Sequence, residues 1–431
     1  MSRANRKNTF SAIFGNRDIL KALVYTVVLL FIFRLGCAIP TPGTNAKVLT
    51  QIMSNSSVLA MMNMFGGGSL SNFSIFALGV SPFISASIIV QLLSMDVLPA
   101  LTEMTKTGEK GRRKLNRITR ILGLVLAAVQ AFALTYGFDR QYGLLVTSNW
   151  KYYGYVTAVL VGGYSIAVWF ADKITRHGIA NGMSMMIFTG IVANIPSIFV
   201  STFSSLVSGK TGNDLYIGTA WFVAFCLVYL LIIVAVIFME TSYRKIRVYY
   251  SNQSMSGMTN DSSFIPVKIN TASVIPVIFA QSLVNVVLMI TSFASKSAYT
   301  KISGILSLTT APGLCIYAFL VIFFTFAYAD MELNPEEMAS QLSKSGGYIR
   351  NIRPGKDTQT YLSKTIARVT VAGAAGLVVL AVLPYILSMV TDLSSASAIG
   401  GTGMIIVVGV ALEAVNSLKA IAAPSRKPNF L

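Results

Sequence analysis

The chain has 431 residues, of which 54% are hydrophobic and only 12% are charged. Soluble domains average about 25% charged residues, so this composition excludes an ordinary water-soluble protein and predicts an all-α integral membrane protein. The formal net charge of +18 would indicate a nucleic-acid partner in a soluble protein, but here the cations follow a membrane pattern.

Ten apolar runs are candidate membrane helices because of their length and composition. They cover residues 19–39, 73–95, 118–138, 152–172, 181–207, 215–239, 271–292, 311–331, 366–390 and 400–418. Cations are frequent before the first run, after the second, near residue 244 and near residue 350, and sparse in the intervening loops. By the positive-inside rule, both termini are predicted to be cytoplasmic.

The first run follows a polar, basic segment and shows no signal-peptide cleavage site, so we expect it to remain as a helix. Arg34 lies toward the outer end of this helix. Snorkelling to the interface would lower the cost of this arginine, and a functional role is the alternative. The three cysteines fall inside apolar runs and are odd in number, so no disulfide framework is expected.

The stretch over residues 59–93 reads LAMMNMFGGGSLSNFSIFALGVSPFISASIIVQLL. The roughly ten residues before Gly66 would cover only about half of a hydrocarbon core about 30 Å thick. The glycines from Gly66 to Gly68 can turn the chain sharply, and non-helical backbone at this depth needs protein or a water-filled cavity around it. We therefore predict a half-helix that is hinged to a full span over residues 72–93.

The second and seventh runs share a proline arrangement. Pro82 is followed by Ile84 in the second run, as Pro276 is followed by Ile278 in the seventh. Val80 and Ile84 also share one helix face. Proline-broken spans at corresponding places in two sets of five helices favour an inverted repeat.

Two stretches of this chain resemble the signatures of the SecY family, the central subunit of the protein-conducting channel. Residues 74–93 are similar to the second-span signature, and residues 169–187, WFADKITRHGIANGMSMMI, are similar to the other one. Span order and loop lengths also match. The resemblance implies ten transmembrane helices in two inverted pseudo-symmetric halves of five, with a plug half-helix before the second span.

The resemblance also divides the chain into regions. They are a cytoplasmic N-terminal segment (1–20), a first half (21–207) that contains the plug (57–66), a second half (208–420) with cytoplasmic loops at 241–268 and 333–365, and a cytoplasmic tail (421–431).

A polypeptide channel in the bacterial plasma membrane is the function that the resemblance implies. It would translocate unfolded secretory polypeptides and release transmembrane segments sideways into lipid. An aliphatic ring suits this task, because it offers no hydrogen bonds to ions and can yield around a chain. The positions that match the family's ring are Val80, Ile84, Ile187, Ile278 and Ile406, and the plug carries Leu59, Met61, Met62, Met64 and Phe65.

The sideways opening of the family lies between the second and third spans and the seventh and eighth. The spans concerned carry Ser85, Gln91, Gln281, Ser282 and Val286. Weak hydrogen bonds across such a seam, about 0.6 kcal/mol each, could close it and still part.

Energy for transport is not encoded in this chain, which has no Gly-rich lysine loop for ATP. His177 is the only histidine, so no histidine-based metal cluster can form, and we expect no enzyme activity and no cofactor. The resemblance implies the SecA ATPase or a translating ribosome as the driving partner. The candidate docking residues are Arg244, Lys245, Arg247, Arg350, Arg353 and Lys356, the first three as contacts to ribosomal RNA phosphates.

Further partners that the resemblance implies are the small membrane subunits SecE and SecG, unfolded or nascent preproteins, and membrane lipids. The chain departs from the family pattern at Ala180, where glycine is usual, and at Arg350 and Asn351, which replace a common Pro-Gly.

A secondary transporter is the main alternative, because it also uses broken helices and inverted repeats. It would need ionisable groups at the midplane, whereas the spans offer Asn194 and Asn285 but no mid-span acid. A membrane enzyme would need convergent acid, base or metal groups, which we do not find in the spans. Ring candidates that lay far apart would count against the channel.

Overall fold

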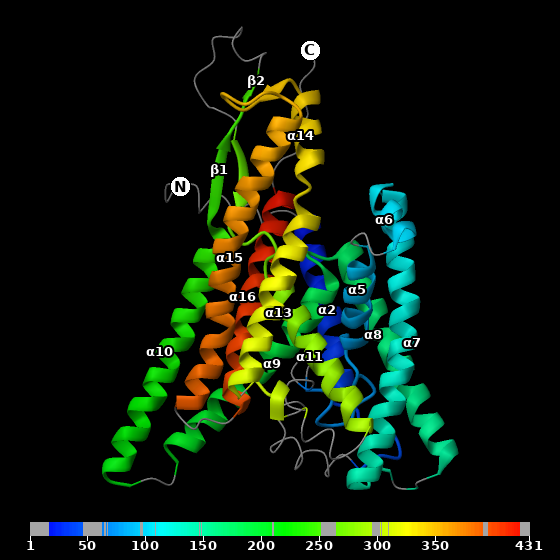
Figure 1. Ribbon diagram of the computed structural model, residues 1–431. Helices are drawn as coiled ribbons and strands as arrows, with labels where there is room; N and C mark the ends of the chain where they lie inside the picture. The colour runs from blue at the N-terminus through cyan, green and yellow to red at the C-terminus, as the bar shows by residue number, and fades with distance from the viewer. Residues whose placement is uncertain are drawn as a thin grey trace.

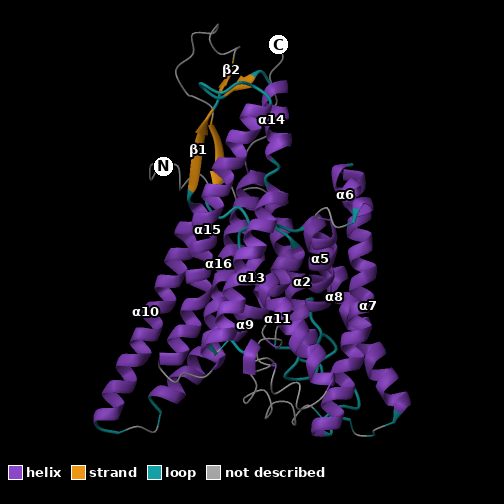
Figure 2. Ribbon diagram, in the orientation of Figure 1, coloured by secondary structure: helices purple, strands orange, loops and turns teal. Residues whose placement is uncertain are grey.

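Long helices run side by side through most of the molecule, and short strands gather at one end of the bundle (Figures 1 and 2). The computed structural model describes residues 17–45, 63, 66, 68–94, 98–107, 109–145, 147, 149–208, 211–250, 264–294, 302, 304–308, 310–390 and 395–422. The structural statements below concern these residues.

The ten predicted apolar runs each coincide with a helix. These helices are α2 (Arg17–Cys37), α5 (Ser81–Ser94), α7 (Glu109–Tyr142), α8 (Trp150–His177), α9 (Gly182–Leu206), α10 (Asn213–Thr241), α11 (Ile275–Ala294), α13 (Ala311–Glu332), α15 (Lys356–Val390) and α16 (Ser395–Ala422). Seven helices among the described residues are long and apolar enough to cross a membrane, and the apolar stretches of α5 and α11 are shorter. Two further helices, α6 (Pro99–Lys106) and α14 (Pro335–Lys344), are amphipathic and lie outside the apolar runs.

Two groups of helices pack against each other. In the first, α5 packs on α7, α7 on α8, and α8 on both α2 and α9. In the second, α11 packs on α13, α13 on α15, and α15 on α16. The groups meet where α5 contacts α11 and where α9 contacts α16. The helix α10, which opens the predicted second half, packs on α16 and also contacts α9. Smaller contacts join α7 to α11 and α2 to α16, so the predicted halves touch along several helix pairs.

The second span differs from the prediction, because its helix begins at Ser81 and not near residue 72. Residues 68–80 form successive turns, and Phe73 has a positive φ of 40°. Leu70 and Phe73 are fully buried, so protein surrounds this irregular backbone, as it must at membrane depth. The 14 residues of α5 rise only about 21 Å, and the turns complete the passage.

The turns before α5 and α11 have matching backbones. Gly79 has φ 54° and Ser273 has φ 51°, and each stands three residues before the proline of its helix, Pro82 or Pro276. Each helix also begins one residue before that proline. Two corresponding segments thus share a left-handed residue, a helix start and a proline.

Hydrogen bonds in the two turns match as well. The Val80 carbonyl accepts from the amides of Phe83 and Ile84 at 3.1 and 3.2 Å. The Val274 carbonyl accepts from the amides three and four residues on at 3.1 and 3.3 Å. This agreement supports the internal repeat that the prolines suggested.

Short strands form where the sequence predicted loops. β1 (Tyr243–Arg247) pairs antiparallel with β3 (Phe264–Lys268), and β2 (Tyr249–Tyr250) pairs with β4 (Gly347–Tyr348). The second pair joins the loop over 241–268 to the loop over 333–365. Their shared apolar core includes Ile246, Val267, Leu342, Ile349, Leu362 and Ile366.

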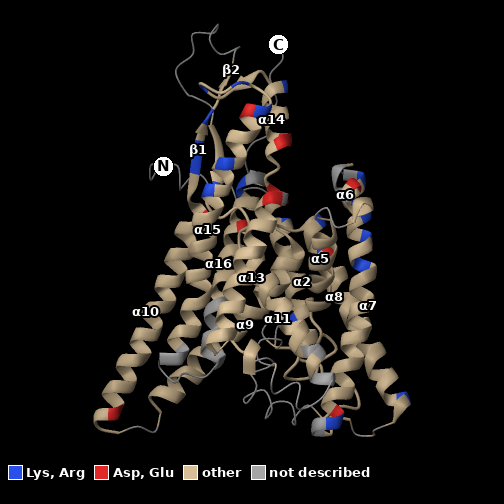
Figure 3. Cartoon of the chain, viewed as in Figure 1, with Lys and Arg blue, Asp and Glu red and all other residues tan. Residues whose placement is uncertain are grey.

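Charged side chains gather at the end of the bundle that carries β1, β2, α14 and α6, and the middle of the bundle is almost entirely uncharged (Figure 3). An ion pair lies near that end, where Arg120 Nη2 of α7 is 2.7 Å from Asp172 Oδ2 of α8. Charged residues at the end of the bundle and uncharged residues in its middle are the arrangement that a lipid environment requires.

Candidate functional site

The five predicted ring residues come from four helices. Val80 directly precedes α5 and Ile84 lies in its first turn, Ile278 lies in the first turn of α11, Ile187 lies early in α9, and Ile406 lies in the middle of α16. Their exposed fractions run from 0% at Ile406 to 9% at Ile278, and all five belong to one apolar cluster.

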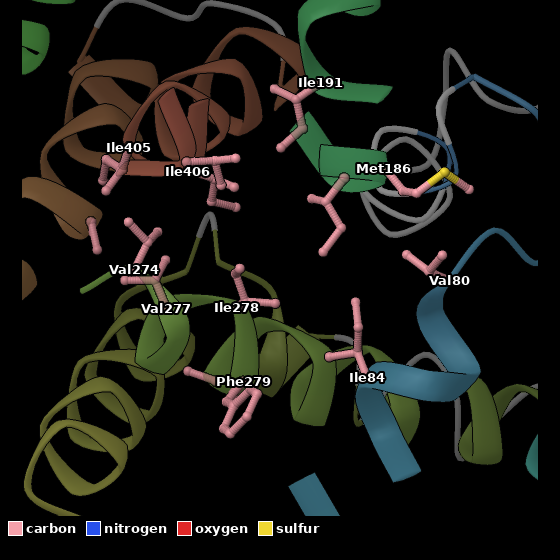
Figure 4. Packing of buried hydrophobic residues seen from close by; sticks show 14 of the residues in the cluster. Val80, Ile84, Met186, Ile191, Val274, Val277, Ile278, Phe279, Ile405 and Ile406 are labelled. Carbon is pink, nitrogen blue, oxygen red and sulfur yellow. The ribbon is translucent and has the colours of Figure 1, made fainter. Parts of the chain in front are cut away.

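Figure 4 shows that side chains from α5, α11 and α16 point toward a common centre. Val80 and Ile84 approach it from one side, Ile278 from a second and Ile406 from a third. Met186 and Ile191 of α9 are labelled on a further side of this centre. The aliphatic side chains among these carry no hydrogen-bonding group, so they offer nothing to a dehydrating ion.

Sequence reasoning missed several members of this cluster. Ile191 and Ile405 are fully buried in it, and Val274 is 3% exposed. Val274 could have been found from the sequence, because it stands two residues before Pro276 as Val80 does before Pro82. Ile191 lies four residues, about one helical turn, after Ile187.

The five predicted plug residues lie outside the residues that the structure describes. Asn63 is described, and it connects the preceding segment to the turns. Its carbonyl accepts from the Gly68 amide at 2.7 Å, and its Oδ1 accepts from the Ser71 amide at 2.9 Å.

Arg34 faces this hinge. A Cβ at Gly68, which has φ 77°, would lie 3.4 Å from Arg34 Nη1 and 3.4 Å from Asn194 Oδ1. The guanidinium therefore lies close to the hinge at Gly68, and Arg34 as a whole is half-buried.

The predicted gate residues lie on α5 and α11, and α11 contacts both α5 and α7. Ser85 Oγ donates to the Ser81 carbonyl at 3.2 Å, and Gln91 Nε2 donates to Ser87 Oγ at 3.1 Å, both within α5. Gln281 Nε2 donates to Tyr385 Oη of α15 at 3.3 Å. Ser282 is buried and Val286 is half-buried.

Two amide side chains occupy corresponding positions on the facing helices. Gln91 stands nine residues after Pro82, and Asn285 stands nine residues after Pro276. Gln91 Oε1 and Asn285 Oδ1 are both buried and accept no hydrogen bond from the described residues. An unsatisfied buried acceptor costs about 1–3 kcal/mol, so α5 and α11 each carry such a penalty.

The first set of predicted docking cations lies on one strand. Arg244, Lys245 and Arg247 of β1 are exposed, whereas Ile246 between them is buried. Lys245 Nζ lies 4.8 Å from the ring centroid of Phe264 on β3 and 5.7 Å from that of Tyr243. The two rings stack with 6° between their planes, so the ammonium sits on an aromatic platform.

The second set lies between β4 and α15. Arg350, Arg353 and Lys356 are exposed, and the backbone between them is held in tight turns by Asn351 at φ 64° and Gly355 at φ 104°. Thr358 Oγ1 also donates to the Arg353 carbonyl at 2.8 Å. Asparagine tolerates a left-handed backbone, so it can replace the glycine that is common here.

Comparison with known proteins by family model and by sequence identifies one family, and comparison of structures shows a shared fold. The family model described as SecY matches residues 74–415 of this chain. A protein translocase subunit SecY from Halalkalibacterium halodurans is 40% identical over 419 residues, which cover 96% of each chain. Two solved structures cover 94% of this chain, and it covers 94% of each, at 16% identity. One, with a TM-score of 0.61, is a SecY whose plug domain stabilises the closed state of the translocation channel; the other, at 0.57, is Sec61 in a canine ribosome-channel complex.

Proposed function

This chain belongs to the SecY family, and from this premise we propose that unfolded secretory polypeptides cross the bacterial plasma membrane through it. It is a multi-pass channel subunit and not an enzyme. The observation that carries the proposal is the convergence of aliphatic side chains from α5, α11 and α16 in Figure 4.

The ring seals by contact between methyl groups. Val80, Ile84, Ile187, Ile278 and Ile406 exclude hydrated ions when they touch, because an apolar constriction gives an ion no replacement for its water. They separate around a polypeptide without breaking any hydrogen bond. The seal therefore does not depend on the amino-acid sequence of the polypeptide that passes.

The plug, residues 57–66, adds a second seal on the outer side of the ring. Burial of a few hundred Å² of apolar surface at about 25 cal/mol per Å² gives several kcal/mol, which favours closure and stays reversible. Asn63 and the Arg34 guanidinium support this role, because both lie against the hinge that begins at Gly66.

The lateral gate is the seam between α5 and α7 on one side and α11 and α13 on the other. Its polar members are Ser85, Gln91, Gln281 and Ser282, with Asn285 as an addition from the structure. The orphan acceptors on Gln91 and Asn285 weaken the closed seam. Water or an entering segment can satisfy them when the helices part, so opening recovers part of this cost.

The driving partner binds the charged end of the bundle, which we assign to the cytoplasm together with both termini. The cations of β1 and of the segment from Arg350 to Lys356 form its docking surface. A Sec61 has been solved in a ribosome-channel complex, which supports a ribosome as one such partner. SecA is the second, and the small subunits SecE and SecG complete the assembly.

Reconstituted transport tests the function. The chain is purified with its small subunits, placed in liposomes, and supplied with SecA, ATP and an unfolded preprotein. We expect ATP-dependent protection of the preprotein from external protease. Replacement of Ile84, Ile278 and Ile406 together by glycine should raise ion efflux, whereas leucine at these positions should not. Transport of a small solute in place of the polypeptide would overturn the proposal in favour of a transporter.

A further inference from the structure

The β1–β3 hairpin is joined at its base to the start of the gate helix α11. The ladder that ends with Tyr243 opposite Lys268 is extended by the Ile269 amide, which donates to the Ser242 carbonyl at 3.0 Å. Ser242 directly follows α10, and Ile269 leads into residues 270–274, which precede α11. A movement of the hairpin is therefore applied directly to the turn before α11.

This turn stores backbone strain. Ser273 has φ 51°, a left-handed conformation that costs a residue with a Cβ on the order of 1 kcal/mol or more. The corresponding residue before α5 is Gly79, which adopts φ 54° without that cost. Serine at this position therefore needs compensating contacts that the first half does not need.

Glu240, at the end of α10, supplies those contacts. Its Oε1 accepts from Asn270 Nδ2 at 2.8 Å and from Ser273 Oγ at 3.0 Å. Asn270 is 1% exposed, and its Nδ2 also donates to the Ser273 carbonyl at 3.0 Å. Two hydrogen bonds thus fix the turn to Glu240 of α10, and the third, from Asn270 to the Ser273 carbonyl, closes the turn itself.

The charges around Glu240 link this contact to the hairpin. Lys268, the last residue of β3, attracts the Glu240 carboxylate, and Glu413 of α16 repels it. Lys268 also attracts Glu413. Displacement of β3 would carry away the cation that favours the charged form of both side chains.

We infer that Glu240 is a positioning residue that holds the turn before α11 in its closed arrangement, and that it releases the turn when a partner displaces the β1–β3 hairpin. Through this turn it sets the position of Ile278 in the ring and of Gln281 in the gate. The inference rests on the proposed channel function, because the role of both residues depends on it.

Hydrogen exchange measures the clamp without any transport. The amides of Val277 and Ile278 bond to the Val274 carbonyl in this turn. Glu240→Ala in the reconstituted complex should speed their exchange about tenfold to a hundredfold, because two charged hydrogen bonds are lost. Glu240→Gln keeps an acceptor oxygen and should restore most of the protection, which a variant that merely misfolds would not do.

Substitutions at Ser273 separate the hydrogen bond from the strain. Ser273→Ala loses the Oγ bond and keeps the strained φ, whereas Ser273→Gly loses the bond and relieves the strain. Exchange at Val277 should therefore be faster in the alanine variant than in the glycine variant. In the first half, Gly79→Ser adds strain without an equivalent of Glu240 and should speed exchange at Ile84.

Ion efflux then tests whether the clamp acts on the channel. We expect Glu240→Ala to raise efflux from liposomes severalfold and Glu240→Gln to return it close to the original rate. Unchanged exchange in Glu240→Ala, or faster exchange with unchanged efflux and export, would overturn the inference. If the unmodified chain fails to export a preprotein while the exchange pattern holds, the proposed function fails and the clamp stands.

Discussion

At the residue scale, we expect the buried acceptors of Gln91 and Asn285 to influence how easily the proposed seam opens. Asn285→Leu removes a buried oxygen that accepts no bond from the described residues, so it should stabilise the closed seam by about 1–3 kcal/mol. That stabilisation lowers the open fraction about 5-fold to 150-fold. Export of preproteins with weakly apolar signal sequences should fall most, and their protease protection in liposomes gives the measurement.

Gln91→Met is the matched variant for this prediction, because Gln91 Oε1 is the corresponding acceptor on α5. Gln91→Met should also lower export. Asn285→Asp is the control, since it keeps a polar group in the seam. Equal export by the leucine variant and the original chain would contradict the account of the orphan acceptors.

Single residues were predictable where a motif or a repeat contained them. The five ring candidates came from the resemblance to the family, and Val274 could be added from its place before Pro276. The proximity of Arg34 to Gly68 was not predictable, because it depends on how the chain folds back toward α2. The contacts of Glu240 with Asn270 were also beyond the sequence, since thirty residues separate them and the intervening hairpin was read as a loop.

At the element scale, we expect the proposed plug and its hinge to act as one unit. Deletion of residues 57–66 should raise ion efflux from liposomes, because the second seal is lost and the ring alone remains. Asn63→Ala is a smaller change that removes the Oδ1 bond to the Ser71 amide, and it should give an intermediate efflux. Conductance measured in planar bilayers checks both values.

A matched control for the deletion is Ser71→Ala, which leaves the backbone amide of residue 71 and its bond to Asn63 intact. Its efflux should equal that of the original chain. If ion efflux from the deletion variant equals that of the original chain, the plug does not contribute to the seal and the ring alone provides it.

Helix positions were predictable from apolar runs, but one boundary and the strands were not. Residues 72–80 are as apolar as a helix, yet Phe73 and Gly79 take positive φ values and delay α5 to Ser81. Hydrophobicity alone cannot separate a buried turn from a buried helix. The strand β1 is short and highly charged, so its pairing depends on β3 and on an apolar core shared with the loop over 333–365.

At the scale of the whole molecule, two groups of helices touch through α5 with α11 and through α9 with α16. Residues 264–274 connect the charged end to α11, which lies in the first of these contacts. A load on the hairpin therefore acts on α11 at one end and, at the other, on α10, which packs on α16. We expect the halves to part at α5 and α11 while the contact of α9 with α16 serves as the hinge.

A covalent link across the seam tests this arrangement. Ser85→Cys with Val286→Cys, joined by a short thiol cross-linker, should block export, because the halves can no longer part. Reduction of the link should restore it. Phe132→Cys with Trp150→Cys joins α7 to α8, whose rings lie 5.7 Å apart within the first half, and this link should leave export unchanged. Full export by the linked seam variant would place the route of the polypeptide elsewhere, since a fixed α5 and α11 could not then be the parting edge.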